Sequence, residues 1–458
     1  MTYTCVSCNR SFPTERGFKV HKARSSGCHV IDKEPEMEMK VPSKTPVMRI
    51  KKPKSAPEPL KNMKFIDLFC GIGGFHCALK SLGAECVLAS DIDEKCRKTY
   101  ETNWGIKPVG DITALESKDI PDFDILCGGF PCQAFSHAGK QGGFEDTRGT
   151  LFREIVRILK DKQPRYFILE NVKNLKNHDN GRTLRVIYSS LKSVGYTMHD
   201  DPICLSPHYY GIPQHRERIF ILGVRNDLVG EKKLVEMKKP SVSLKSSIYD
   251  ILEDVSVPYP ELEIPKHTKE VLDKWEELII YFKGIRVKLP SFPIWTEYWI
   301  IDDSMEKEIK KMPKWKQSFI SKNREFFEAH QSFLHDWFIS AKKLKEFYGA
   351  KSKLEWQCGG FKNEDSLWNL LFTFRPSGIR IKRIDYSPAL VAMAQIVYVG
   401  SRHRKLSPRE VARLQSYPDT FKLHASANVA YKQFGNSVNV HVIKQLATFI
   451  VTGMLESQ

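Results

Sequence analysis

Short apolar runs alternate with helical stretches from Met63 onward, and this alternation constrains the fold more than any other feature of the chain. The runs KFIDLF, CVLAS, FDILCGG, YFILENV and RIFILGV are typical of strands, and helical periodicity marks 94–103, 149–161 and 182–194. Strands that alternate with helices form a parallel sheet with helices on both faces. The sequence therefore predicts an α/β fold built on a doubly wound, Rossmann-like domain.

Changes in composition divide the chain into five segments. The first holds a Cys/His cluster, and the second is rich in Pro, Lys and Glu without apolar periodicity, as in flexible linkers. The fourth is aromatic and holds seven of the eight tryptophans. The predicted segments are a Cys/His module (1–29), a linker (30–62), the main α/β core (63–230), a smaller domain (231–385) and a C-terminal segment that completes the core (386–458).

The net charge of +17 suggests a polyanionic partner, and its distribution is uneven. Residues 1–62 hold 13 basic and 6 acidic side chains and residues 386–458 hold 8 and 3, whereas residues 63–230 hold 22 and 21. This pattern favours an auxiliary grip on nucleic acid by the two ends of the chain, and a solvated basic tail is the alternative.

Neither a membrane nor a secreted location is expected. No apolar run approaches the roughly 20 residues of a membrane span, and MTYTCVSCNR lacks the apolar core of a signal peptide. The 11 cysteines stand mostly alone in apolar segments, which is unlike a disulfide framework. We therefore expect an intracellular protein in a reducing compartment, cytoplasm or nucleus.

A glycine-rich turn follows the first strand, in DLFCGIGG. Gly71 and Gly73 allow close approach of a ligand, and Asp91, about 20 residues on, ends the second strand where a carboxylate can accept ribose hydroxyls. Asp111 lies where a third strand would end. NAD and S-adenosylmethionine both fit this pattern, and capping of the following helices is the alternative role for the two acids.

Two later strands end in reactive side chains. Cys132, in GGFPCQAFS, follows FDILC in a tight loop, where a thiol can be exposed to substrate. Glu170 closes the apolar run YFILENV, so burial should raise its pKa towards general-acid use. Arg216 and Arg218 precede IFILGV at alternate positions and so face one side, where they could hold a phosphate or a pyrimidine carbonyl.

Taken in order, these blocks resemble the DNA (cytosine-5) methyltransferase family, and the small bacterial modification enzymes in particular. The matching motifs are DLFCGIGGF, GDIT, GGFPCQAFS, GKQGGFEDTRGTLF, ENV, YGIPQHRERIFILGVRNDL, LSPREVARLQSYPD and YKQFGNSVNV, over roughly 63–230 and 386–458. The resemblance implies an S-adenosylmethionine-dependent methyltransferase domain with a smaller target-recognition domain. It also implies double-stranded DNA as partner and methylation of C5 of a flipped-out cytosine through a covalent Cys132–C6 adduct.

The resemblance also implies a role for each matched residue. For the cofactor, Phe69, Gly71 and Gly73 would line the pocket, Asp91 would bind the ribose, Asp111 the adenine amino group, Ile92 the adenine face, and Asn436 would close the methionine end. For catalysis, Cys132 would be the nucleophile, Glu170 the acid at the ring, and Arg216 and Arg218 the supporting basic pair.

Residues 231–385 stand where the family carries its target-recognition region. We expect most of its tryptophans to form the core of this domain. In FRPSGIRIKRIDY, residues Arg375, Arg380, Lys382 and Arg383 are the DNA-binding candidates, with a solvated basic strand as the alternative. Where the family usually has a Thr-Leu pair, this chain has Ala389-Leu390, which puts one hydroxyl contact in doubt.

The N-terminal module is similar to a Cys2His2 zinc finger. Cys5, Cys8 and His21 have the spacing of its first three ligands, and Cys28 or His29 would be the fourth. We favour Cys28, and a metal-free remnant is the alternative. So short a module cannot bury a core unaided and should depend on zinc for its fold.

Two other functions fit the same sequence. One is an RNA (tRNA) cytosine-C5 methyltransferase, against which the large 231–385 segment weighs. The other is a catalytically silent DNA-binding protein, against which the intact Cys132, Glu170 and Arg218 weigh. We expect the protein to be a monomer.

Overall fold

The computed structural model describes residues 3–4, 11–12, 58–131, 150–238, 240, 245–254, 259–390 and 395–456. The chain forms two compact units, Met1–Ala56 and Pro57–Gln458. In the first unit, β1 (Tyr3–Thr4) and β2 (Ser11–Phe12) pair antiparallel. The zinc-ligand candidates of this unit lie outside the described residues.

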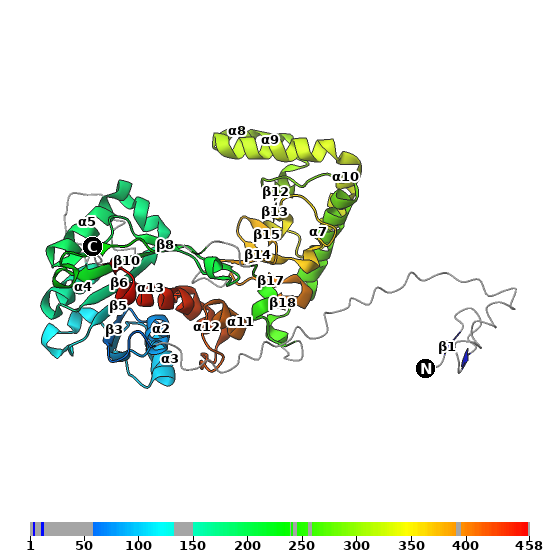
Figure 1. The fold of residues 1–458 in the computed structure, drawn as a ribbon. Coiled ribbons are helices and arrows are strands. Elements are labelled where there is room, and N and C mark those ends of the chain that lie inside the picture. Colours follow the sequence, from blue (N-terminus) through cyan, green and yellow to red (C-terminus); the bar gives the residue numbers. More distant parts are fainter. Residues whose placement is uncertain are drawn as a thin grey trace. The chain divides into compact units, whose positions relative to one another are not determined.

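The second unit is built on a seven-stranded sheet, with the order β4-β3-β5-β6-β10-β7 and with β8 also paired to β10 (Figure 1). Four strands are parallel, as the alternation of strands and helices predicts. These strands are β3 (Lys64–Leu68), β4 (Glu85–Ser90), β5 (Ile125–Gly129) and β6 (Tyr166–Val172).

The sheet is mixed, so the prediction of a wholly parallel sheet is wrong on one side. β10 (Arg218–Arg225) runs antiparallel to β6 and pairs also with β7 (Tyr196–Thr197) and β8 (Ile203–Leu205). The chain between β8 and β10 lies at the end of β6 where Val172 pairs with Arg218, so β10 has to run back along its neighbour. The third strand expected before Asp111 is only an isolated bridge between Ser90 and Val109.

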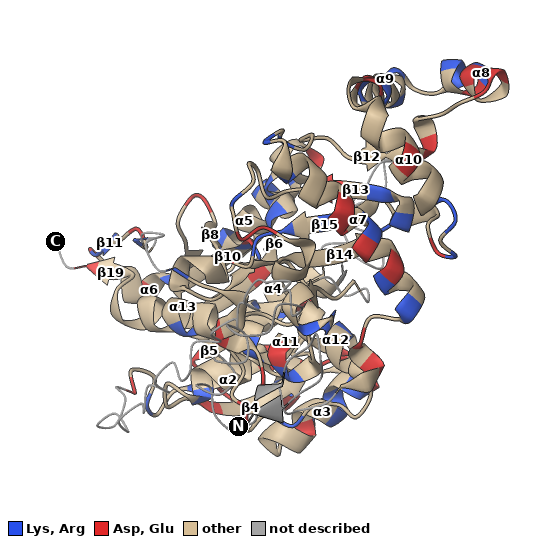
Figure 2. Ribbon diagram, turned by 90° about the vertical axis from the view of Figure 1, so that its right-hand side faces the viewer, with Lys and Arg blue, Asp and Glu red and all other residues tan. Residues whose placement is uncertain are grey.

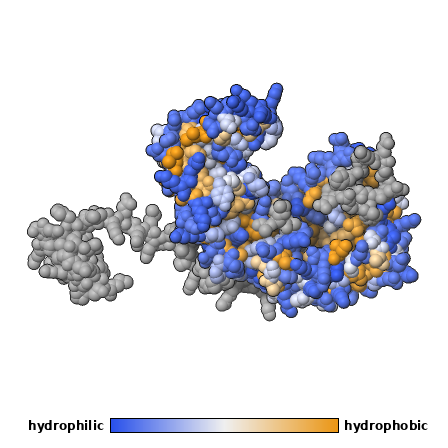
Figure 3. All heavy atoms as spheres, turned by 180° about the vertical axis from the view of Figure 1, so that it is seen from behind, coloured by the Kyte–Doolittle hydropathy of each residue, from blue (hydrophilic) through white to orange (hydrophobic). Residues whose placement is uncertain are grey.

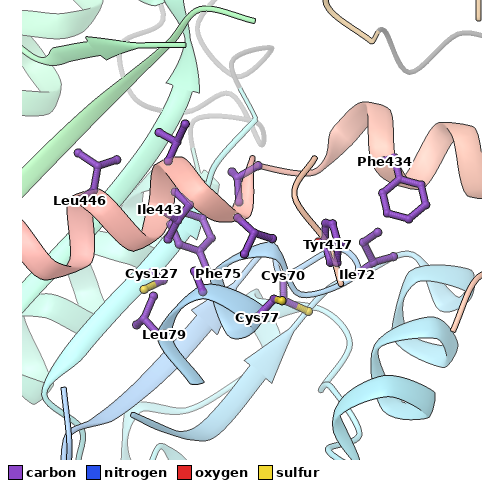
Figure 4. Close-up of a cluster of buried hydrophobic side chains, with 14 of the residues drawn as sticks. Cys70, Ile72, Phe75, Cys77, Leu79, Cys127, Tyr417, Phe434, Ile443 and Leu446 are labelled. Atoms are coloured by element: carbon purple, nitrogen blue, oxygen red, sulfur yellow. The ribbon is translucent and has the colours of Figure 1, made fainter. Parts of the chain in front are cut away.

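Helices cover both faces of the sheet, which confirms the doubly wound arrangement. Alternate strand residues serve the two faces: Phe65 and Cys127 belong to one core, and Ile66 and Leu126 to the other. On the first face, side chains of α13 meet those of α2 (Figure 4). The helices are α2 (Gly74–Lys80) and α13 (Val440–Thr452) on the first face, and α4 (Thr150–Lys162) and α5 (Arg182–Ser193) on the second.

Residues within 260–405 form a second core around another sheet. Its strand order is β12-β13-β15-β14-β17-β18. The strands are β12 (Ile294–Trp295), β13 (Lys353–Trp356), β14 (Leu371–Arg375), β15 (Gly378–Lys382), β17 (Tyr398–Val399) and β18 (Arg404–Lys405). The helices are α7 (Lys266–Gly284), α8 (Asp303–Lys311), α9 (Lys314–Ala329) and α10 (Gln331–Ala341).

The tryptophans of this segment are mostly core residues, as expected. Trp275, Trp299, Trp337 and Trp356 are buried, whereas Trp315 is 61% exposed. The remaining elements are α3 (Glu94–Trp104), β9 (Gln214–His215), α6 (Asn226–Val229), β11 (Lys233–Leu234), β16 (Ser387–Pro388), α11 (Pro408–Leu414), α12 (Ala427–Asn436) and β19 (Leu455–Glu456).

Among the described residues, no helix is long and apolar enough to cross a membrane. On the face drawn in Figure 3, hydrophobic residues form scattered patches within a mostly hydrophilic surface.

Candidate active site

The candidate residues gather where the parallel strands end. The glycine turn follows β3, Asp91 follows β4, Pro131 follows β5, and Glu170 lies near the end of β6. Ligands of doubly wound sheets bind outside the carboxyl ends of the strands. The fold thus brings segments from four strands to one edge.

The two predicted pocket glycines differ in their surroundings. Gly71 has a φ of +53°, and a Cβ built there would meet nothing within 4 Å. Gly73 has a φ of +88°, and a Cβ there would lie 2.2 Å from Nε1 of Trp104. Gly71 therefore leaves open space for a ligand, while Gly73 is needed for its backbone conformation and for close packing. Trp104, which closes the space at Gly73, lies outside the sequence motifs named above.

Asp91 ties the glycine turn to the second strand. Its Oδ2 accepts a hydrogen bond from Gly71 N at 2.8 Å, and its Oδ1 accepts one from Asp93 N at 2.8 Å. Burial raises the pKa of Asp91, and these two amides oppose the increase. Each oxygen keeps a further lone pair, so the carboxylate can still accept hydroxyl groups from a ligand.

Three other predicted cofactor residues surround this turn or follow it. Ile92 is 77% exposed next to Asp91, which leaves an apolar surface free for a flat ring. Phe69 has a φ of +55° at the start of the turn. Asp111 accepts a hydrogen bond from Thr113 N at 2.9 Å, so it caps a 3-10 helix as the alternative predicted.

The C-terminal segment closes on the same turn. Asn436 ends α12 and is exposed, in a cavity that Asp93 and Lys95 also line. A Cβ built at Gly74 would lie 2.9 Å from Ser437 Oγ and 2.6 Å from Val438 Cγ2. The start of α2, directly after the glycine turn, therefore packs against the two residues that follow Asn436.

Glu170 forms an ion pair with Arg218, with Oε1 and Nε 3.0 Å apart. Burial raises the pKa of Glu170, and the positive charges of Arg218 and Arg216 oppose the increase. In the β5–β6 ladder Glu170 pairs with Gly129, where a Cβ would lie 3.2 Å from Glu170 Oε2. A glycine at 129 therefore makes room for the carboxylate beside the loop that leads to Cys132.

Arg216 is enclosed in the fold rather than open to solvent. Its Nη1 donates to Leu390 O at 2.6 Å, and its Nη2 donates to Gly435 O at 2.8 Å and Ser437 O at 3.0 Å. Burial lowers the pKa of Arg216 to about 9, and Arg218 acts in the same direction. Arg216 lines a small cavity together with Glu170 and Arg218, so the predicted basic pair lies together, although its two guanidinium groups have different partners.

Asn171, the middle residue of ENV, has a role that the sequence analysis did not assign. Its Nδ2 donates to Phe130 O at 2.9 Å, and the side chain is buried. It thereby links the end of β6 to the loop after β5. Its place next to Glu170 at a strand end was the available signal.

Three of the four DNA-binding candidates share one face of the β14–β15 hairpin. Because side chains alternate along strands, Arg375, Arg380 and Lys382 lie opposite the face of Phe372 and Ile381, which belong to the core. Among the described side chains, Glu355 is the only acidic group paired to this face, through Arg380 at 2.8 Å. Lys and Arg near β13 and β15 are visible in Figure 2.

Arg383, the fourth candidate, has structural partners. It forms an ion pair with Asp365 at 2.6 Å and donates to the carbonyl groups of Cys358 and Gly360. Its guanidinium group is therefore occupied by partners within residues 358–365.

Cys132 and the zinc-ligand candidates Cys5, Cys8, His21 and Cys28 lie outside the described residues. In the part of the chain that the structure describes, no group of three or more His, Cys, Asp or Glu side chains could hold a metal ion.

Comparison with known proteins agrees with this arrangement. The family model described as C-5 cytosine-specific DNA methylase matches residues 63–452. The chain is 35% identical over 388 residues to the type II methyltransferase M.HhaI of Haemophilus parahaemolyticus, covering 85% of this chain and 94% of that protein. It is 38% identical over 395 residues to M.HpaII of Haemophilus parainfluenzae, covering 86% and 90%.

A solved structure shares the fold. The structure of a Spodoptera frugiperda DNMT2 mutant aligns with a TM-score of 0.50 at 19% identity, covering 85% of this chain and 99% of that chain.

Proposed function

The chain belongs to the C-5 cytosine-specific DNA methylase family, and we propose that it transfers a methyl group from S-adenosylmethionine to C5 of a flipped-out cytosine in a specific DNA sequence. The observation that carries this proposal is the placement of Glu170, ion-paired with Arg218 and in register with Gly129, three residues before Cys132. That arrangement supports an acid acting together with the nucleophile, because Gly129 and Cys132 are close in the chain.

The side chains explain how an unreactive ring carbon becomes nucleophilic. The Cys132 thiolate adds to C6 and forms a sulfur–carbon bond. The C5–C6 double-bond electrons then form a C4–C5 double bond, while the C4–N3 double-bond electrons take a proton from Glu170 at N3. C5 of the resulting enamine can then take a methyl group. Loss of the C5 proton afterwards expels the thiolate, and N3 returns its proton to Glu170, which restores the aromatic ring and the enzyme. Because C6 is inaccessible in a stacked duplex, the cytosine must leave the helix.

The residues at the glycine turn fit S-adenosylmethionine. Gly71 leaves open space for a ligand. Asp91 places a carboxylate in hydrogen-bond contact with the turn, and Ile92 has an exposed apolar side chain. Phe69, Gly73, Asp111 and Asn436 would complete the pocket. When bound, this cofactor supplies an electrophilic methyl group on a sulfonium.

The recognition surface that we assign to DNA is the cationic face of the β14–β15 hairpin. This face carries Arg375, Arg380 and Lys382, and among the described residues one acid, Glu355, pairs with it. Bound DNA would neutralise the repulsion between these neighbouring positive charges. Arg383 would support the hairpin through Asp365.

The relatives are named type II methyltransferases, and we propose the same DNA modification role here, as part of restriction-modification. The N-terminal module would bind zinc through Cys5, Cys8, His21 and Cys28 and strengthen the grip on DNA.

The test is transfer of a labelled methyl group to unmethylated genomic DNA and, in parallel, to tRNA. We expect labelled 5-methylcytosine in DNA only, and none with Cys132→Ser. Transfer to tRNA in preference to DNA, or full turnover by Cys132→Ser, would contradict the proposal.

A further inference from the structure

An aromatic cluster lies between the cationic hairpin and the candidate active site. His208 and His215 stack with ring centroids 4.8 Å apart and an interplanar angle of 25°. The Tyr386 ring lies 6.2 Å from His208 and 5.7 Å from His215. We call these three residues the His–Tyr cluster. Its neighbours at the two ends are Lys382, whose Nζ lies 5.6 Å from the Tyr386 ring, and Arg216, which follows His215.

The imidazoles have ring nitrogens available for a ligand. His208 Nδ1 is 2.7 Å from Ser206 Oγ, which also accepts a hydrogen bond from Arg216 N at 2.9 Å. Ser206 can donate to a neutral imidazole or accept from a protonated one, so either state of His208 is satisfied. Among the described residues, nothing bonds to Nε2 of His208 or to either ring nitrogen of His215. Both side chains are partly exposed.

The charges around the cluster do not neutralise two imidazolium ions. Among the residues that the structure describes, the acid that interacts with them is Glu217, whose carboxylate is bound to Lys173 Nζ at 2.8 Å. The other ionisable groups nearby are Tyr209 and Cys204 on the core side and Lys382 on the hairpin side. Burial lowers the pKa of His208, and His215 acts in the same direction, while Glu217 opposes both. An added anion beside the cluster would therefore favour the protonated form of His208.

We propose that His208 and His215 together bind a backbone phosphate of the target DNA, and that protons are taken up when they do. This rests on the proposed function, in which DNA is the substrate. Lys382 of the hairpin contacts Tyr386, and Tyr386 contacts both imidazoles. His215 lies three residues before Arg218, the ion-pair partner of Glu170, so we expect a strand that reaches both the hairpin and Glu170 to pass the cluster. A phosphodiester supplies the missing anion, and the two imidazolium groups donate to its oxygens.

The test measures DNA affinity against pH by fluorescence anisotropy, at constant ionic strength from pH 6 to 8.5, with a short unmethylated duplex of mixed sequence. Each histidine that is neutral in the free protein and protonated in the DNA complex lowers the DNA affinity by at most about tenfold for every unit that the pH rises. We expect the wild type to show this decline. The double variant His208→Gln/His215→Gln should bind more weakly at pH 6, match the wild type at pH 8.5, and have a flatter profile.

His335→Gln is the control, because His335 is exposed and lies beside Asp336 in α10, away from the cluster in the sequence. It should keep the wild-type slope. Calorimetric titration at pH 7 in two buffers of different ionisation enthalpy counts the protons directly, and we expect uptake by the wild type that the double variant loses. An unchanged slope or unchanged uptake in the double variant would overturn the inference. If the wild type methylates DNA but its DNA affinity does not depend on pH, this inference alone is refuted. If the wild type transfers no methyl group to any DNA, the proposed function is refuted.

Discussion

Replacing Arg216 with methionine should destabilise the protein and weaken cofactor binding together. The guanidinium group is 3% exposed and donates to three carbonyl groups, those of Leu390, Gly435 and Ser437. A buried carbonyl left without its donor costs about 1–3 kcal/mol, which gives roughly 3–9 kcal/mol for three. Removing a buried charge returns several kcal/mol of desolvation energy. We therefore expect a net loss of about 3 kcal/mol in the free energy of unfolding.

The effect on the cofactor follows from the position of Asn436 between two of these carbonyl groups. The measurements are urea denaturation and calorimetric titration with S-adenosylmethionine. Arg404→Met is the control, because Arg404 is also buried, in an ion pair with Glu410 at 2.7 Å, and its partners lie outside 435–437. We expect a similar loss of stability in both variants and weaker cofactor binding in Arg216→Met only. A loss below about 1 kcal/mol, or equal cofactor affinity in the two variants, would refute the reasoning.

Three further predictions concern Glu170, the glycine turn and the N-terminal segment. Because burial raises the pKa of Glu170, its protonated form persists to higher pH, so the methylation rate should fall as pH rises through that pKa. Glu170→Gln should lower the rate by about 10²–10⁴-fold and remove that pH limb, and a variant with the wild-type pH profile would contradict this. Gly73→Ala should destabilise more than Gly105→Ala in thermal denaturation, since both glycines have positive φ but only Gly73 is blocked by Trp104; equal melting temperatures would argue against the packing role. Deleting residues 1–56 should weaken DNA binding and reduce its salt dependence while bisulfite sequencing finds the same methylated site, and a changed site would contradict an auxiliary role for this segment.

Much of the candidate site was accessible from local sequence pattern. The glycine turn, Asp91 and Glu170 each end an apolar run, and the carboxyl ends of parallel strands meet at one edge of a sheet. Their assembly could therefore be predicted without knowing the packing of the helices. The same reasoning placed most tryptophans of residues 231–385 in a core.

Other features depended on distant parts of the chain. The direction of β10 was mispredicted, because an apolar run has the same sequence pattern whether the strand is parallel or antiparallel to its neighbour. The structure pairs Arg383, one of the DNA-binding candidates, with Asp365, a partner 18 residues away that the basic strand itself does not indicate. Asn171 was passed over because its partner, Phe130 O, lies in another strand's loop.

By itself the sequence determined which elements form and which reactive side chains stand at strand ends, because both depend on neighbours within a few residues. Only the tertiary structure decided the partners of the long polar side chains. Arg216 is 174 residues from Leu390 and 219 from Gly435, and nothing local specifies those carbonyl groups. The cost of burying a charge without partners makes the fold, rather than the motif, determine where such a guanidinium group points.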